Sequence, residues 1–208
     1  MRTVKEYDER RNEILDRSAQ LFAEKGYEKC TVNDILKAVA IAKGTFYYYF
    51  KSKEEVMDAI VSRMTDGIIL RAQAIPDRTD LGPQEKLVQA FLSMRADGHG
   101  EGEILTELHK PENVLMHQKT LNQLVTRLSP VLAEIISDGM EKNVWQCAYP
   151  LEYMQIFLAA AVTLTDEGIF ALSGEERMKI MSALASVLEK MLQLPEGSCK
   201  QAFMQNWG

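Results

Sequence analysis

Apolar residues recur every three to four positions along almost the whole chain, which is the spacing of a helix face rather than of a strand. The sequence lacks runs of β-branched residues separated by hairpin turns. We therefore expect an all-α protein of about nine helices. At 208 residues, the chain is long enough to form one or two domains with a buried core.

Flanking residues mark the ends of the first expected helices. The first covers about residues 9–25, because Gly26 supplies the left-handed residue that ends a helix. The second starts at Thr31, which forms a capping box with Asp34 three positions later. After a very tight junction, a short third helix is expected over residues 42–50.

The other helices are expected between breaks that contain proline or glycine. A capping box of Ser52 and Glu55 opens a fourth helix, and the stretch 74–83 is the candidate linker that follows it. The remaining helices are expected at residues 83–96, up to about 110 after a break at 97–103, then at 112–142, 150–172 and 173–192. The last of these begins with another capping box, Ser173 and Glu176.

The charge of the chain is unevenly distributed. A net charge of −6 taken alone argues against a nucleic-acid partner. However, residues 1–53 carry 11 Lys and Arg against 8 Asp and Glu, a net charge of +3, whereas residues 54–208 carry a net charge of −9. This asymmetry indicates that only the first part of the chain meets a polyanion.

A helix of about four turns, a helix of two turns, a tight turn and another helix of two turns form a helix-turn-helix, whose last helix enters the major groove of DNA. Phe46 and Phe50 fall on one side of the helix at 42–50 and would anchor it. The opposite face is basic and aromatic, with Lys43, Gly44, Tyr47, Tyr48 and Lys51. A DNA-reading face and an exposed tyrosine patch for a protein contact both fit this pattern.

The segment GYEKCTVNDILKAVAIAKGTFYYYFKSKEEV, residues 26–56, resembles the N-terminal domain of TetR/AcrR-family transcriptional regulators. Its Gly-Tyr helix end, its threonine cap, KGTFYYYF and Lys-Ser-Lys before Glu-Glu carry the resemblance. The resemblance implies a three-helix helix-turn-helix domain for DNA binding in residues 1–53. It also implies a larger helical domain for ligand binding and dimerisation in residues 54–208.

Carried onto this sequence, the resemblance implies that nine residues contact DNA: Thr31, Asn33, Lys43, Gly44, Thr45, Tyr47, Tyr48, Tyr49 and Lys53. Lys43 would reach a base edge or a phosphate, and Gly44 would let the backbone approach the duplex. Thr45 offers a hydroxyl and a methyl group to the bases, and Tyr47 would pack on thymine methyl groups.

The remaining contacts implied by the resemblance are mostly with the DNA backbone. Tyr48, Tyr49 and Lys53 would bind phosphates, as would the amides just after Thr31 at the positive end of a helix. Asn33 would contact a base or a phosphate. A basic N-terminal segment with Arg2, Lys5, Arg10 and Arg11 fits either an arm near the minor groove or a solvated terminus.

Two residues depart from the family pattern. Ala40 stands where a glycine is usual, so the turn is made either without a positive φ or with strain. Ala42 replaces a Ser or Thr, which removes a helix cap of roughly 1 kcal/mol and a phosphate-binding hydroxyl. A lower operator affinity or an unusual operator is expected to follow.

The resemblance also implies a homodimer formed by the last two long helices. In support, residues 154–164 are apolar all round and require burial on more than one face. A monomeric helical core is the alternative interpretation. A small-molecule effector is expected among the helices after Lys53, but its identity and its binding residues cannot be read from the sequence.

Other classes of site gain no support from the sequence. Cys30, Cys147 and Cys199 form no zinc-binding or disulfide pattern, and His109 and His117 lack same-face spacing, so neither a metal nor a cofactor is expected. No catalytic motif supports an enzyme. The absence of a signal peptide or a membrane-length apolar run predicts a cytoplasmic protein without a membrane partner.

These features together predict a ligand-responsive, sequence-specific DNA-binding regulator, expected to be a repressor that a small molecule releases from double-stranded operator DNA. The alternative is an all-helical ligand-binding or protein-interaction module that has lost specific DNA binding. The changes at Ala40 and Ala42 are compatible with that alternative.

Overall fold

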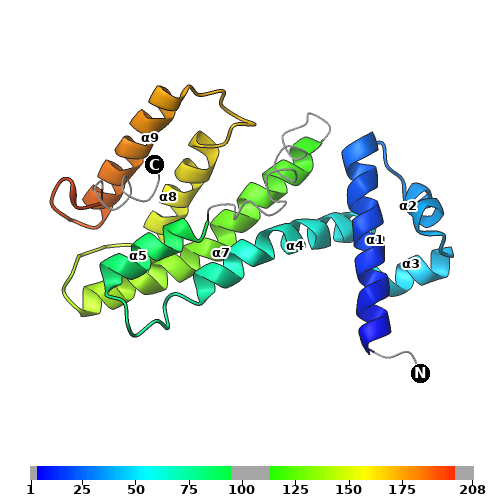
Figure 1. The fold of residues 1–208 in the computed structure, drawn as a ribbon, viewed down its shortest axis with the longest axis horizontal. Helices are drawn as coiled ribbons and strands as arrows, with labels where there is room; N and C mark the ends of the chain where they lie inside the picture. Colours follow the sequence, from blue (N-terminus) through cyan, green and yellow to red (C-terminus); the bar gives the residue numbers. More distant parts are fainter. Residues whose placement is uncertain (1–3, 95–112, 200–208) are drawn as a thin grey trace. The chain divides into compact units, whose positions relative to one another are not determined.

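The computed structural model describes residues 4–94 and 113–199, and this part of the chain is built of helices (Figure 1). No strand occurs among these residues, which confirms the all-α prediction. The described helices are α1 (Val4–Lys25), α2 (Val32–Val39), α3 (Lys43–Tyr49), α4 (Lys53–Gln73), α5 (Pro83–Leu92), α7 (Val114–Glu141), α8 (Pro150–Leu164) and α9 (Gly174–Met191).

The described chain divides into two compact units, of which the first comprises residues 4–64 and 113–120. Its α1, α2 and α3 lie together in Figure 1. Their apolar faces and the first turns of α4 form one core, whose largest fully buried side chains are Ile14, Leu15, Phe22, Ile35, Phe46, Phe50, Met57 and Ile60. The first turns of α7 belong to the same core, because Met116 is 4% exposed within it.

The ends of α1 and α2 follow the signals in the sequence. Helix α1 ends at Lys25, and Gly26 has a φ of 77°. The Thr31 side chain accepts a hydrogen bond from the Asp34 amide, and the Asp34 carboxylate accepts one from the Thr31 amide. This reciprocal pair confirms the predicted capping box.

The second unit comprises residues 65–94 and 121–199. It has its own apolar core, which includes Ile69, Leu128, Leu132, Ile135, Met154, Leu158 and Leu188. Helices α8 and α9 pack against each other in this unit. The predicted capping box at the start of α9 is present, with Ser173 accepting from the Glu176 amide.

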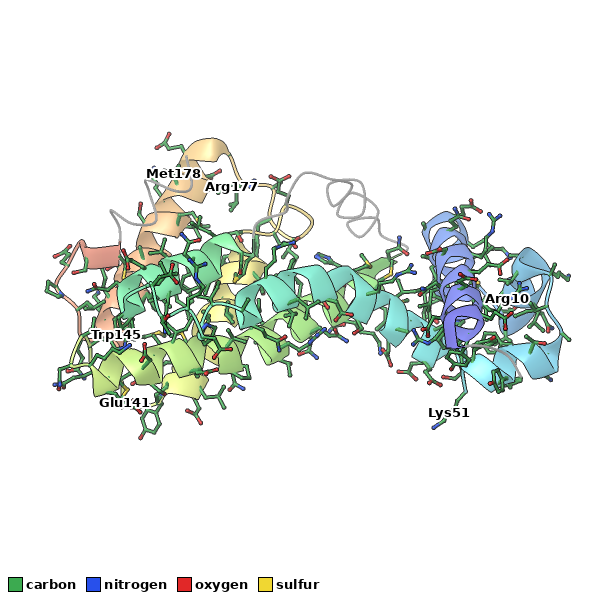
Figure 2. All side chains as sticks on the ribbon, turned by 60° about the horizontal axis from the view of Figure 1, so that its bottom comes forward. Arg10, Lys51, Glu141, Trp145, Arg177 and Met178 are labelled. Atoms are coloured by element: carbon green, nitrogen blue, oxygen red, sulfur yellow. The ribbon has the colours of Figure 1, made fainter. Side chains whose placement is uncertain are left out.

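Trp145 holds the segment between α7 and α8 against α7 in the second unit (Figure 2). Its indole Nε1 donates a hydrogen bond of 2.7 Å to the Ile136 carbonyl of α7. The ring lies against the backbone of Gly139, where an added Cβ would come within 2.1 Å of it. Position 139 is therefore a glycine because the indole occupies the space of a side chain.

Three helix boundaries differ from the prediction. Helix α5 ends at Leu92 rather than at residue 96. Helix α1 starts at Val4 rather than near residue 9. Helix α8 ends at Leu164 rather than at 172, because Asp166 forms a competing turn. The Asp166 carboxylate accepts from the Gly168 amide and its carbonyl accepts from the Ile169 and Phe170 amides, so the chain leaves the helix there.

Some expectations lie outside the described residues. They are the break at 97–103, the short helix that ends near 110, Arg2 and His109. In the described part of the chain, no helix is long and apolar enough to cross a membrane. The proposed domain boundary after residue 53 stays a prediction.

The contact between Trp145 and Gly139 predicts a large effect of a single methyl group. Gly139→Ala should lower the free energy of unfolding by about 1–3 kcal/mol, because the indole or the helix must move. Urea denaturation at a fixed protein concentration measures this change. Gly67→Ala on the exposed face of α4 is the matched control, since its Cβ would meet only the end of the Arg71 side chain at 3.6 Å. That variant should be up to about 1 kcal/mol more stable, and an equal response of the two variants would contradict the assigned packing.

Candidate nucleic-acid interface

The turn between α2 and α3 is made by an alanine in a left-handed conformation. Ala40 has φ 54° and ψ 47°, and the Ile41 amide donates to the Leu36 carbonyl at 3.1 Å to close the helix end. Such a conformation costs an alanine roughly 1–2 kcal/mol. The sequence allowed a turn without a positive φ or a strained turn at Ala40, and the structure shows the strained turn.

Helix α3 begins without a side-chain cap. Ala42 occupies the N-cap position in an extended conformation, and no side-chain hydrogen bond is made there. The helix has seven residues, too few to be stable alone in water. Its position must therefore come from tertiary packing.

Two phenylalanines supply that packing. Phe46 is 0% and Phe50 is 1% exposed, and their ring centroids lie 6.1 Å apart in the core of the first unit. The Arg11 guanidinium of α1 lies over the Phe50 ring at 5.1 Å. These contacts confirm the predicted anchoring face of α3 and determine which residues remain outside.

The outward face of α3 is basic, small and aromatic. Tyr47 is 47% and Tyr48 66% exposed, and Lys43 and Gly44 are exposed as well. The Lys43 Nζ lies 6.0 Å from the centroid of the Tyr47 ring, close enough for a cation–π attraction. Thr45 is half-buried at the edge of this face.

Gly44 has open space around it. An added Cβ would meet no atom within 4 Å, and the backbone there is helical. The fold of the free chain therefore does not require a glycine at this position. An approaching ligand backbone is a physical reason for one.

Tyr49 is placed differently from the two tyrosines before it. It is 6% exposed, and its hydroxyl is buried without a hydrogen-bond partner. Its ring packs on Tyr7 of α1 at 4.8 Å and on Tyr48 at 5.0 Å between centroids. In this conformation Tyr49 supports the exposed face and does not offer its hydroxyl to a phosphate.

Lys53, at the start of α4, hydrogen-bonds the backbone of the segment between α1 and α2 within the first unit. Its Nζ donates to the Tyr27 carbonyl at 2.7 Å and to the Cys30 carbonyl at 2.9 Å, and it lies 3.9 Å from the centroid of the Tyr27 ring. The ammonium group has three donors, so two of them hold the turn between α1 and α2.

The start of α2 combines an exposed polar face with a charged pair. Asn33 and Thr31 are exposed, and Lys25 pairs with Asp34 at 2.9 Å. The Lys25 ammonium, followed by the Thr31 amide and hydroxyl, holds the pKa of Asp34 well below its usual range. The first amides of α2 point out of the helix end, where an anion is favoured.

The basic residues near the N-terminus belong to a helix. Arg10 pairs with Glu13 at 2.6 Å, and Arg11 packs on Phe50. The backbone from Val4 onward is helical, so an extended arm at these positions is excluded. The reason is that Tyr7 packs on Tyr49 of α3 and Arg11 packs on Phe50, the residue that ends this helix.

Tyr7 was missed by the sequence reasoning, although a signal for it exists. Residues 7, 11, 14 and 18 follow helical spacing, so the buried stripe of α1 extends upstream of Ile14. Both tyrosine contacts of Tyr7 lie on α3.

Among the described residues, no group of three or more His, Cys, Asp or Glu side chains is placed to hold a metal ion.

The sequence matches two family descriptions. Residues 14–60 match "Bacterial regulatory proteins, tetR family" and residues 100–187 match "Tetracyclin repressor-like, C-terminal domain". An uncharacterised helix-turn-helix transcriptional regulator of Lactococcus lactis, from the lacX 3' region, is 30% identical over 140 residues. These residues cover 61% of this chain and 68% of that protein. The chain belongs to the TetR family.

Other TetR-family proteins show how far the similarity extends. The repressor KstR2 of Mycolicibacterium smegmatis is 35% identical over 97 residues, which are 46% of this chain and 47% of KstR2. This chain thus spans about half the length of the first curated relatives it matches. The crystal structure of the TetR-family regulator PfmR from Thermus thermophilus shares the fold, with a TM-score of 0.54 at 21% identity over 94% of this chain and 99% of PfmR.

The two hydrogen bonds from Lys53 to backbone carbonyls predict a loss of stability when the lysine charge is removed. Lys53→Met keeps an apolar stem but leaves two carbonyls without their donor, so it should cost about 1–3 kcal/mol of unfolding free energy. Lys51→Met is the matched control, since Lys51 is exposed and points away from the ribbon in Figure 2. Chemical denaturation of the control should stay within about 0.5 kcal/mol of the parent. Equal free energies of unfolding for the two variants would show that the hydrogen bonds of Lys53 do not stabilise the fold.

Proposed function

We propose that this TetR-family chain is a ligand-responsive, sequence-specific DNA-binding transcriptional regulator, a repressor that a small molecule releases from its operator. The observation that carries the proposal is the outward face of α3. Two buried phenylalanines hold this short helix, and a lysine, a glycine and two tyrosines face outward. Such a face has little reason to be exposed to water alone.

On this proposal, α3 lies in the major groove and reads base edges. Lys43 and Thr45 hydrogen-bond bases or phosphates, Tyr47 packs on thymine methyl groups, and Gly44 permits close approach of the backbone. Tyr48, with its exposed ring, binds a phosphate. Tyr49 takes no part in contacting DNA and supports Tyr48 by ring packing.

Contacts to the DNA backbone would position α3. The first amides of α2, after Thr31, form an anion site together with the exposed amide side chain of Asn33. Lys53 contributes its third donor to a neighbouring phosphate. Because this lysine also holds the turn before α2, its loss would affect both stability and affinity.

Dimerisation is proposed through α8 and α9. Both helices expose large apolar side chains: Leu151 (38%), Ile156 (58%), Met178 (42%) and Val187 (42%). A two-fold dimer would present two α3 helices to half-sites about 34–36 Å apart. A protein with this role would work in the cytoplasm, and no enzymatic activity is proposed for it.

Binding to the DNA that flanks its own gene tests the function. Fluorescence anisotropy with a labelled duplex should show two chains per site. The affinity should be at least about 10³-fold above that for a random duplex. For each tenfold rise in salt concentration, the logarithm of the binding constant should fall by about 0.9 per neutralised phosphate. Absence of a sequence preference would sink the repressor proposal and favour the helical module that has lost DNA binding.

A single methyl group at Gly44 tests the docking of α3. Gly44→Ala should leave the fold intact or slightly more stable, because the Cβ meets no atom within 4 Å. If DNA approaches the backbone there, the affinity for the flanking duplex should fall at least tenfold. Gly174→Ala, in the first turn of α9, also has open space around it and should bind DNA like the parent. Unchanged binding by Gly44→Ala would contradict the close approach.

A further inference from the structure

The second unit contains a pocket of about 260 Å³ that DNA binding itself does not use. Leu87 and Val88 of α5 line one side, and Trp145, Leu194 and Cys199 line the others. Protein interiors are packed like crystals and contain few voids larger than a water molecule. Gln84 and Ser198 in its lining are exposed, so the pocket is open to solvent on that side. Its volume exceeds the roughly 150 Å³ of a cavity that binds benzene.

The Trp145 wall of this cavity is fixed before any ligand arrives. The indole Nε1 is held by the Ile136 carbonyl at 2.7 Å, and the ring is 4% exposed against Gly139. An indole held in this way has no freedom to collapse into the empty space. The cavity is therefore preformed on this side.

A buried carboxylate fixes another part of the lining. Glu189 of α9 is 3% exposed, and its two oxygens accept from the Gly197 amide at 3.0 Å and the Cys199 amide at 2.7 Å. The Leu194 amide also donates to the Glu189 carbonyl at 2.8 Å. These bonds hold Leu194 and Cys199 in place as lining residues.

The lining indicates the chemistry of an occupant. It includes no charged side chain, and its polar groups are Gln84, Ser198 and the Cys199 thiol. Burial, with a smaller contribution from Glu189, raises the pKa of that thiol to about 11, so it stays neutral and weakly nucleophilic. The Lys86 ammonium on α5 is already engaged by the Pro76 carbonyl at 2.6 Å.

We propose that this cavity is a binding site for a small neutral molecule with a compact hydrocarbon ring body and one hydroxyl or carbonyl group. The ring body packs on Trp145, Leu87 and Val88, and the polar group hydrogen-bonds Gln84 or Ser198. Binding is non-covalent. The site gives the small molecule of the proposed function a place in the second unit and to that extent rests on that function, but ligand binding is measured without DNA, so each proposal can fail alone.

Tryptophan fluorescence of the full chain tests the site directly. The sequence contains two tryptophans, and Trp207→Phe leaves Trp145 as the single reporter. Titration with 1-adamantanol, a neutral cage alcohol that does not absorb near the indole bands, should give a saturable change in emission. The adamantane carboxylate and adamantane ammonium ions have the same body with a charge, and each should bind at least tenfold more weakly.

Two substitutions that fill the cavity from different walls locate the binding. Val88→Phe and Ser198→Leu should each weaken 1-adamantanol binding at least tenfold. Val114→Phe, the same substitution at an exposed position of α7, should bind like the parent. No saturable change, equal binding of the charged analogues, or retained affinity in both cavity variants would each overturn the proposal.

Discussion

The position of α3 depends on the burial of Phe46 and Phe50. Seven residues make too few hydrogen bonds to offset the cost of ordering an isolated helix, so α3 exists because these two rings enter the core of the first unit. The same burial determines which residues face outward. Rotating the helix by one residue would bury Tyr47 and expose Phe46, since helical neighbours lie about 100° apart.

Several other features serve this arrangement. Tyr7 of α1 packs beside Tyr48 and Tyr49, and Lys53 ties α4 to the turn that precedes α2. The strained Ala40 closes α2 at a place where a glycine would do so without cost. The first unit thus accepts a local cost, because the surrounding core determines the course of the turn.

Sequence reasoning predicted the elements of this unit well, because their signals are local. The Thr31 capping box, the helix end at Gly26 and the anchoring pair on α3 each depend on residues within one or two turns. Long-range contacts were not accessible in this way. Nothing near Lys53 in the sequence indicates that it binds carbonyls 23 and 26 residues upstream, and helical periodicity alone places Tyr49 at the border between buried and exposed.

The most direct test of the account is a comparison of amide hydrogen exchange in the free chain and in its complex with the flanking duplex. Exchange reports local protection at single segments, so it locates the contact surface without a substitution. Bound DNA should slow exchange at the first turn of α2 and along residues 43–48 of α3, and leave the core amides near Phe22 unchanged. Protection that avoids both segments, while the duplex is bound, would contradict α3 as the DNA-reading helix.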